Sequence, residues 1–304
     1  MEKNRKGIIL AGGKGTRLSP ITNGVSKQML PIYDKPLIYY PLSTLMLGGI
    51  KEILIITTPY DLDSFKRLLG DGALWGIEIS YAIQENPEGV AQAYLIADKF
   101  LNKSPSALIL GDNLFYGNQL VDLMRKADAF KNLSTIFTYP VNNPSEYGIV
   151  TFDKSGKPKK IIEKPQQYES RFAITGLYYY DDSAPERAKT IKPSRRGEME
   201  ISSLNQLYLD DGKLKIMQMG RGLSWLDTGN IDSLHEASSY IRTIEHRQGL
   251  KIGCPEEISW RLGWINDTQL ESLAQPLMKS GYGNYLMQIL KEKNFVDNYL
   301  IKYR

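Results

Sequence analysis

Short apolar segments alternate with amphipathic ones through the first part of this chain, and the alternation limits the folds available to it. Strands are predicted at residues 7–10, 52–57, 77–84 and 106–110, with helices at 36–47, 62–69 and 90–100 between them. The first strand, Ile8-Ile9-Leu10, is apolar throughout, as expected for a strand buried on both faces. The predicted fold class is α/β, with a Rossmann-like, mostly parallel central sheet and helices on both faces.

The pattern changes near residue 134, where strand-like segments follow one another without intervening helices. Strands are predicted at 135–141, 148–152, 160–163, 174–180, 214–219 and 223–226, and helices at 200–209 and 231–248. These segments indicate an α+β insertion. We expect a main domain at residues 1–249, made of parts at 1–133 and 134–229, and a helical segment at 250–304 packed against it.

Composition excludes several classes of protein. The net charge of +4 over 304 residues is a small basic excess without a basic run, so nucleic acid is not an expected partner. No apolar run approaches the length of a membrane span, and a cytoplasmic protein is expected. The chain has one cysteine, Cys254, and two histidines, which is too few for an internal disulfide or a zinc-ligand cluster.

A glycine-rich turn, LAGGKGTRL at residues 10–18, directly follows the first predicted strand. Glycines allow the backbone to approach a polyanion closely, and successive N–H groups can then point at one phosphate. The turn lacks the third glycine of a dinucleotide fingerprint, and its Gly-Lys pair is not followed by Ser or Thr as in a P-loop. It is therefore interpreted as a phosphate-binding turn of another kind.

Further polar residues follow other strands of the predicted sheet. Gln84, Pro87 and Gly89 follow the third strand, and Gly111-Asp112-Asn113 follow the fourth. Ligands of open α/β sheets bind at the carboxyl ends of strands, so these turns predict one nucleotide site. Arg17 and Lys27 are suitable counter-charges for a triphosphate, although either could be a solvated surface cation.

Two aspartates follow apolar segments and are candidate ligands of Mg²⁺. Asp112 ends the run Ala107–Leu110, and Asp227 follows Ser224-Trp225-Leu226. Magnesium prefers one or two carboxylates together with phosphate oxygens and water. Each aspartate alone could instead cap a helix or stabilise a turn. Their similar contexts favour a metal site.

An acid beside a base, Glu163-Lys164, ends another strand-like segment and is suited to a phosphorylated sugar, because the carboxylate accepts from hydroxyls while the ammonium binds phosphate. An exposed turn pair is the alternative interpretation. Tyr147 and Tyr178 are assigned to the same site, although aromatic residues on strands more often belong to the core.

Together these motifs resemble the sugar-phosphate nucleotidyltransferases, and among them the glucose-1-phosphate thymidylyltransferases. Besides LAGGKGTRLSP, the resemblance rests on SKQMLPIYDKPLIYYP, LILGDNLFYG, IIEKP and GRGLSWLDTGN, and it extends to about residue 287. It implies transfer of a thymidylyl group from dTTP to glucose 1-phosphate, with Mg²⁺ as cofactor. It also implies a homotetramer that supplies deoxysugar synthesis and is inhibited by dTDP-rhamnose or a similar nucleotide sugar.

The resemblance also implies roles for individual residues. The nucleotide-binding set is Leu10, Ala11, Gly12, Gly13, Gly15, Thr16, Arg17, Lys27, Gln28, Gln84, Pro87, Gly89 and Asp112. The sugar-phosphate set is Asn113, Tyr147, Gly148, Glu163, Lys164, Ile174, Tyr178 and Arg196. Catalysis is assigned to Arg17, Lys27, Asp112, Lys164 and Asp227, with Asp112 and Asp227 as metal ligands. A regulatory site is assigned to Gly117, Arg221, Glu257, Ile258 and Arg261. Residues 1–133 would form the nucleotide-binding part and 134–229 the sugar-phosphate part.

Two alternatives remain open. Within the same enzyme class the chain could transfer a uridylyl group to glucose 1-phosphate, and guanylyl or adenylyl transfer ranks lower. Outside that class it could be a catalytically silent subunit that senses nucleotide sugars. The presence of Arg17, Lys27, Asp112, Lys164 and Asp227 together argues against a silent protein.

Overall fold

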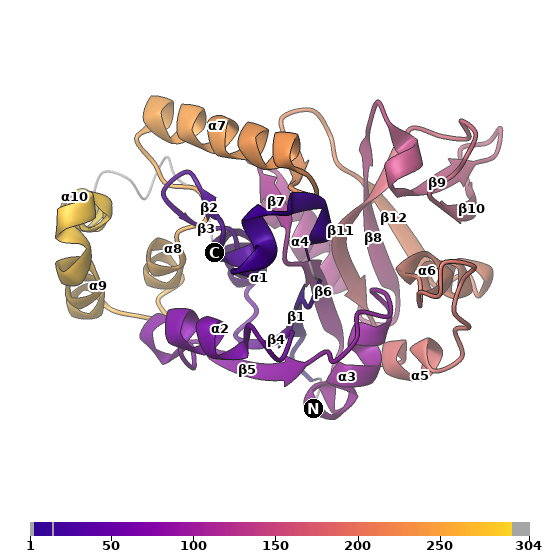
Figure 1. Cartoon of the computed structure of the whole chain (residues 1–304), viewed down its shortest axis with the longest axis horizontal. Coiled ribbons are helices and arrows are strands. Elements are labelled where there is room, and N and C mark those ends of the chain that lie inside the picture. Colours follow the sequence, from indigo (N-terminus) through magenta and orange to yellow (C-terminus); the bar gives the residue numbers. More distant parts are fainter. Residues whose placement is uncertain (1–2, 14, 294–304) are drawn as a thin grey trace.

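The structure is a computed structural model that describes residues 3–13 and 15–293. Four parallel strands form its centre (Figure 1). They are β1 (Lys6–Ala11), β4 (Glu52–Thr57), β5 (Glu78–Ile83) and β6 (Ser106–Leu110), in the spatial order β6-β1-β4-β5. Each agrees with its predicted range to within one residue at either end. The predicted α/β fold with a mostly parallel central sheet is confirmed.

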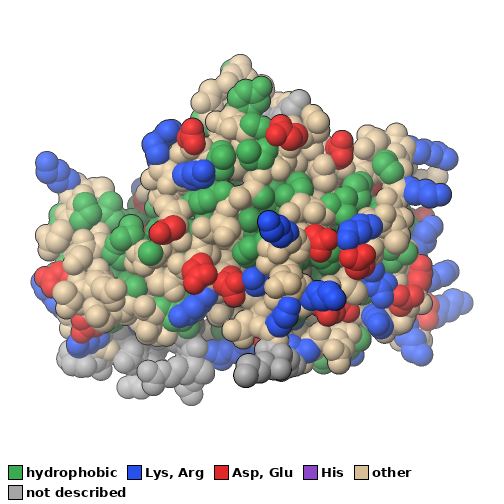
Figure 2. Space-filling view, turned by 90° about the horizontal axis from the view of Figure 1, so that it is seen from below, with side chains coloured by type: hydrophobic (Ala, Val, Ile, Leu, Met, Phe, Trp, Pro, Cys, Tyr) green, Lys and Arg blue, Asp and Glu red, His purple; other side chains and the backbone are tan. Residues whose placement is uncertain are grey.

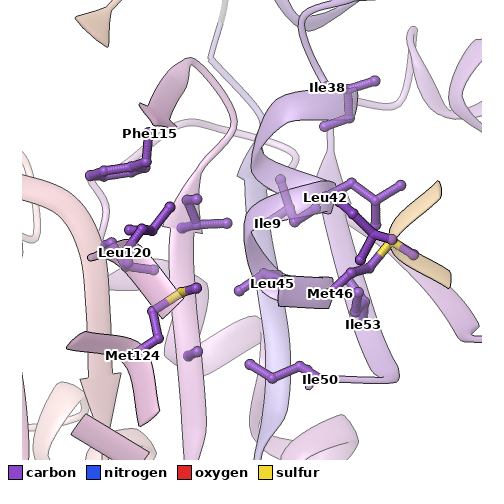
Figure 3. Packing of buried hydrophobic residues seen from close by; sticks show 14 of the residues in the cluster. Ile9, Ile38, Leu42, Leu45, Met46, Ile50, Ile53, Phe115, Leu120 and Met124 are labelled. Atoms are coloured by element: carbon purple, nitrogen blue, oxygen red, sulfur yellow. The ribbon is translucent and has the colours of Figure 1, made fainter. Parts of the chain in front are cut away.

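Apolar side chains on both faces of these strands explain their sequence. Along β1, Ile8 packs into one hydrophobic cluster and Ile9 into another on the opposite face. Helices α1 (Tyr39–Leu47), α2 (Leu62–Leu69) and α4 (Leu120–Ala129) cover the Ile9 face. Helices α3 (Gln92–Leu101), α5 (Ala184–Ala188) and α6 (Ile201–Asp210) cover the Ile8 face. Figure 3 shows the Ile9 cluster, in which Leu42 and Leu45 of α1 pack against the sheet.

The second half of the chain extends the sheet with mainly antiparallel pairs. The strands are β8 (Ser134–Pro140), β9 (Gly148–Phe152), β10 (Pro158–Glu163), β11 (Phe172–Tyr180) and β12 (Leu214–Gln218). Strand β11 pairs antiparallel with β6, β8 and β9, whereas β12 pairs parallel with β8. These elements agree with the predicted α+β insertion to within two residues and lie beyond β6 in the sheet (Figure 1).

A separate two-stranded ribbon, which the sequence did not predict as such, crosses near the centre of the fold. It consists of β7 (Asn113–Tyr116) and β13 (Ser224–Asp227), paired antiparallel so that Asn113 lies opposite Asp227. As predicted, the chain leaves the main sheet after Leu110. It then enters β7, whose partner strand lies far away in the sequence.

Local hydrogen bonds decide where two helices begin. A helix was expected from residue 36, but α1 starts at Tyr39 because the preceding residues bond back to an earlier segment: Leu37 N donates to Leu30 O and Ile38 N to Gln28 O. Short strands β2 (Pro31–Ile32) and β3 (Lys35–Pro36) pair in this segment. Helix α7 (Ile231–Gln248) begins as predicted, since Asn230 and Ser233 form a capping box.

The C-terminal helices pack against the main domain at its N-terminal half. They are α8 (Pro255–Arg261), α9 (Asp267–Ala274) and α10 (Tyr282–Lys291), at one end of the molecule in Figure 1. Helix α8 contacts α1, and Trp75 Nε1 donates to the buried Glu256 carboxylate over 3.2 Å. The part of the predicted segment beyond residue 293 lies outside the described residues.

The surface carries both signs of charge. On the face shown in Figure 2, Lys and Arg side chains are interspersed with Asp and Glu. Among the described residues, no helix has the length and apolarity needed to cross a bilayer.

Candidate active site

The glycine-rich turn leaves the end of β1 and packs against a glutamine from another strand end. A Cβ atom added at Gly12 would lie 2.1 Å from Gln84 Oε1, so only glycine allows this approach. Gly15 has φ of 61°, in the left-handed region, and directs the chain into the short 3₁₀ helix η1 (Thr16–Leu18). This helix carries Arg17. The turns after β1 and β5 are therefore adjacent, as predicted.

Another 3₁₀ helix, η3 (Lys27–Met29), brings Lys27 to the same edge of the sheet. Lys27 is only 6% exposed, and its Nζ lies 2.6 Å from Asp112 Oδ2. Burial alone would raise the pKa of Asp112, but the charge and hydrogen bond of Lys27 hold this pKa below its usual value. The predicted triphosphate cation and the predicted metal ligand thus form an ion pair.

The neighbouring Asn113 is buried, and its side chain holds several segments together. Its Nδ2 donates to Asp112 Oδ1 over 2.8 Å, while its Oδ1 accepts from Gly176 N at 3.1 Å and from Trp225 Nε1 at 2.6 Å. Thr228 adds two hydrogen bonds to the Asp112 carbonyl, from its N at 3.1 Å and from its Oγ1 at 2.9 Å. The main chain and the carboxylate of Asp112 are therefore both held.

Asp227 ends β13, where it pairs with Asn113, the residue that follows Asp112. A Cβ atom at Gly229 would lie 3.3 Å from both Asp227 carboxylate oxygens and 3.4 Å from Arg17 Nη1, which places carboxylate and guanidinium beside the same glycine. Burial, and then the negative charge of Asp112, raise the pKa of Asp227 to about 6. Lys27 and Arg17 oppose this shift only in part.

The predicted sugar-phosphate residues form a second charged group on the α+β part. Glu163 Oε2 accepts from Ser202 Oγ over 2.5 Å, and a Cβ atom at Gly148 would lie 3.0 Å from the same carboxylate oxygen. Arg196 lies 2.8 Å from Glu198, 3.6 Å from Glu200 and 3.7 Å from Glu163. Burial, and secondarily the charge of Glu163, raise the pKa of Glu200.

Two tyrosines connect the two charged groups. Burial and the negative charge of Asp227 raise the pKa of Tyr147 to about 12, and its ring lies 5.1 Å from that of Trp225 between centroids. Tyr178 is 3% exposed, and burial followed by the charges of Glu163, Asp112 and Asp227 raises its pKa. Both phenols therefore stay protonated near neutral pH and lie within electrostatic reach of the aspartates.

Other predicted residues lie around these groups. Lys164 is exposed, has φ of 42° and donates its backbone N–H to Tyr147 O. Ile174 is buried near Gly148, and Gln28 is buried beside Gly111. A cavity of about 440 Å³ adjoins the glycine-rich turn, and Gly12, Gly13 and Pro87 are among its lining residues. The remaining nucleotide residues, Leu10, Ala11 and Thr16, flank the same turn.

The loop that carries Pro87 and Gly89 is attached to the α+β part. Met199 N donates to Glu88 O over 2.6 Å, and Ala91 N donates to Met199 O over 3.0 Å. Gly89 has φ of 107°, and a Cβ atom there would lie 2.5 Å from Met199 O. Glycine is thus required by both the backbone conformation and the close contact.

A larger cavity, of about 560 Å³, lies between α1, the end of β7, and α8. Three of the predicted regulatory residues line it: Gly117, Glu257 and Ile258. Arg261 Nε lies 2.7 Å from Glu257 Oε1, and its Nη2 is buried without a hydrogen-bond partner among the described residues. Arg221 is exposed beside Gly222, whose carbonyl oxygen lies 2.5 Å from a Cβ atom built at Gly117.

Several residues that position the site were not predicted from the sequence. Thr228 lies in the motif LDTGN, where only the aspartate was assigned, and Ser202 is one of many serines. Met199 acts through its backbone, so its side chain gave no signal. Of these residues, only Thr228 could have been recognised from the sequence, because it directly follows an assigned aspartate.

The pair of aspartates fits the chemistry of a bound Mg²⁺ ion. Asp112 directly precedes Asn113, the residue that pairs with Asp227 in the ribbon, and the negative charge of Asp112 raises the pKa of Asp227. A divalent cation between carboxylates would relieve this repulsion. Within residues 3–13 and 15–293, no group of three or more His, Cys, Asp or Glu side chains is arranged to hold a metal, so other ligands would have to come from substrate and water.

Comparison with known proteins identifies the family. A sequence model of nucleotidyl transferases matches residues 6–244. The chain is 57% identical over 287 residues to the glucose-1-phosphate thymidylyltransferase of Xanthomonas campestris pv. campestris, covering 94% of this chain and 97% of that protein. It is 54% identical over 287 residues to the protein of that name from Neisseria meningitidis serogroup A, covering 94% and 100%.

Solved structures agree with this relationship. The crystal structure of a candidate glucose-1-phosphate thymidylyltransferase from Bacillus anthracis, in complex with a sucrose, matches with a TM-score of 0.73 and 34% identity. The match covers 79% of this chain and 96% of that one. The chain belongs to the nucleotidyl transferase family. Within that family it is similar, over nearly its whole length, to the glucose-1-phosphate thymidylyltransferases.

The raised pKa of Asp227 predicts a pH-dependent stability difference. Its folded-state pKa of about 6 lies above its usual value of 3.8, so the folded protein binds more protons between these values and gains stability as the pH falls. In metal-free buffer at pH values well above about 6, Asp227→Asn should raise the melting temperature. This advantage should shrink towards acidic pH. Asp63→Asn, which changes an exposed aspartate on α2, should show no such trend, and an Asp227→Asn effect independent of pH would contradict the assignment.

Proposed function

We propose that this protein transfers a thymidylyl group from dTTP to α-D-glucose 1-phosphate, giving dTDP-glucose and pyrophosphate. The observation that carries the proposal is the convergence of Arg17, Lys27 and the two aspartates at one edge of the sheet, next to a second charged group at Glu163 and Arg196. The similarity to glucose-1-phosphate thymidylyltransferases supports the choice of substrates.

On the nucleotide side, the glycine-rich turn and two cations are suited to the triphosphate. The backbone of Gly12 and Gly13 can approach phosphate oxygens closely, and Arg17 offers a planar pair of donors. Lys27 is held against Asp112 until substrates bind. Both cations stabilise the negative charge that develops on the departing pyrophosphate. Gln84 and Gly89 would receive the base.

On the sugar side, no general base is required. A phosphate monoester has a second pKa of about 6, so glucose 1-phosphate is mostly dianionic at neutral pH and is already a nucleophile. Lys164 and Arg196 bind its phosphate, and Glu163 accepts hydrogen bonds from sugar hydroxyls. One phosphate oxygen attacks the α-phosphorus of dTTP in line, a new P–O bond forms, and the bond to pyrophosphate breaks.

Asp112 and Asp227 would hold Mg²⁺. When bound, the ion would neutralise charge on the phosphate oxygens and help to orient them. The main chain and side chain of Asp112 are held by Thr228 and Asn113, so this carboxylate keeps its position without rearrangement. The homotetramer and the place in deoxysugar synthesis that the resemblance implies are part of the same proposal.

A substrate panel tests the reaction. Purified protein should release pyrophosphate fastest with dTTP and glucose 1-phosphate. Because uracil lacks only one methyl group, UTP should react less efficiently by about tenfold rather than fail. Purine triphosphates should react much more slowly. A preference for UTP would favour the uridylyltransferase alternative, and binding without any pyrophosphate release would favour a silent sensor.

Removal of either carboxylate charge should strongly reduce turnover. Asp112→Asn and Asp227→Asn keep the side-chain shape but lose the charge, and each should lower kcat more than about 100-fold with Mg²⁺ present. The matched control is Asp63→Asn on the exposed side of α2, which should retain wild-type rates. Near-normal kcat in both site variants would contradict the metal assignment.

The cavity between α1 and α8 supports a second, regulatory function. Its lining residues are separate from the proposed active site. Arg261 forms an ion pair with Glu257, which lines the cavity, and Nη2 of this arginine is buried without a hydrogen-bond partner among the described residues. We assign this cavity to a nucleotide sugar such as dTDP-rhamnose, whose diphosphate would be bound by cations. Arg221 and Arg261 are the candidates.

Charge removal at these arginines should weaken inhibition without affecting catalysis. With Arg221→Ala combined with Arg261→Gln, dTDP-rhamnose should inhibit at least about tenfold less strongly, while the Michaelis constants stay near wild type. Arg242→Ala, an exposed arginine on α7, is the control. Unchanged inhibition that is purely competitive with dTTP would assign the effector to the active site instead.

A further inference from the structure

The side-chain amide of Gln84, at the proposed nucleotide site, has two possible orientations. Gln84 lies against the glycine-rich turn and is 3% exposed. The two ends of its amide have nearly the same size but opposite hydrogen-bonding character, because the oxygen accepts and the nitrogen donates. If the amide is free to turn over, Gln84 can pair with either kind of base edge. The inference below rests on the proposed function.

Gln92, the first residue of α3, has an orientation that its neighbours define without ambiguity. Its Oε1 accepts from the backbone N–H of Glu88 over 3.1 Å, and its Nε2 donates to the Glu88 carboxylate over 2.9 Å. A backbone N–H can only donate, and an ionised carboxylate can only accept. Turning the Gln92 amide over would break both hydrogen bonds, so its oxygen must face this way.

The backbone of Glu88 is itself held in place by a hydrogen bond. Its carbonyl accepts from Met199 N over 2.6 Å, and the nearby Ala91 N donates to Met199 O. The two segments are in such close contact at Gly89 that no side chain fits there. The backbone N–H that orients Gln92 is therefore held on the α+β part of the protein.

The orientation of Gln92 determines that of Gln84. Gln84 Nε2 donates to the same Gln92 Oε1 over 2.5 Å. Because that oxygen can only accept, Gln84 must present its nitrogen to α3 and its oxygen towards Gly12. A turned Gln84 would place two carbonyl oxygens in contact, which is repulsive.

We propose that Gln92 is a positioning residue that holds the Gln84 amide with its oxygen towards the glycine-rich turn, and so selects pyrimidines that carry a hydrogen on N3. Thymine and uracil have an N3–H donor next to a carbonyl acceptor. They match an amide that offers an oxygen with an N–H beside it. Cytosine has an N3 acceptor next to an amino donor, and its pattern is reversed.

The experiment compares dTTP, UTP and dCTP as substrates for the wild type and for Gln92→Leu. The leucine removes the group that orients Gln84, so kcat/KM should fall for dTTP and UTP alike, mainly through KM, and rise or stay constant for dCTP. The ratio of dTTP to dCTP should drop about tenfold or more. The ratio of dTTP to UTP should not change, because both bases present the same hydrogen-bonding edge.

Gln92→Glu tests the direction of the hydrogen bonds. A carboxylate can accept from Gln84 but cannot donate, so the base preference should be retained even if its repulsion from Glu88 weakens the loop. Adding Glu88→Gln should then restore stability. Gln288→Leu is the matched control, since Gln288 on α10 makes a similar hydrogen bond with Glu292, just after that helix and far along the chain from the site.

The outcomes separate this inference from the proposed function. If the wild type fails to use dTTP, the proposed function is wrong. If the wild type uses dTTP but Gln92→Leu lowers kcat/KM for all three triphosphates by the same factor, Gln92 has only a structural role in the loop and the inference is overturned. Loss of base selectivity in Gln92→Glu as well would also overturn it.

Discussion

The candidate site depends on the hydrogen bonds of one buried amide, that of Asn113. Its oxygen accepts from the backbone of Gly176 and the indole of Trp225, and its nitrogen donates to Asp112. The pairing of β11 with β8 shifts register between Ile174 and Tyr178, and Gly176 N–H lies within this irregular segment. A Cβ atom at Gly176 would lie 2.4 Å from the Asn113 oxygen, so the amide needs both the irregularity and the glycine.

The same ribbon leads from the proposed active site to the cavity beside α8. The ribbon of β7 and β13 carries Asn113 and Asp227 at one end, next to the proposed active site. At the other end, Tyr116 and Gly117 line the cavity beside α8. Helix α7 joins the same two regions. It begins just after Asp227, and the side chain of its last residue, Gln248, accepts a hydrogen bond from the Tyr116 hydroxyl over 2.5 Å. A ligand in the larger cavity would therefore contact the same short strand that leads to Asp112.

Local patterns in the sequence predicted most of the elements and the family. The strands β1, β4 and β6 are apolar because helices cover both faces, and this property is visible along the chain itself. The glycine-rich turn, Arg17 and the aspartates were also recognisable, since each follows an apolar segment or a glycine directly. The ribbon was not predicted, because its strands are four residues long and their pairing joins residues 113–116 to 224–227.

The sequence by itself therefore determined the kind of sheet, and it predicted candidate residues for phosphate, metal and sugar, because these properties depend on residue type and on short-range periodicity. Only the tertiary structure decided how the residues act on one another. It paired Lys27 with Asp112, placed Asp227 where burial and a neighbouring charge raise its pKa to about 6, and linked Gln84 through Gln92 to Glu88. These effects depend on distance and burial between segments far apart in the chain, and no local pattern records them.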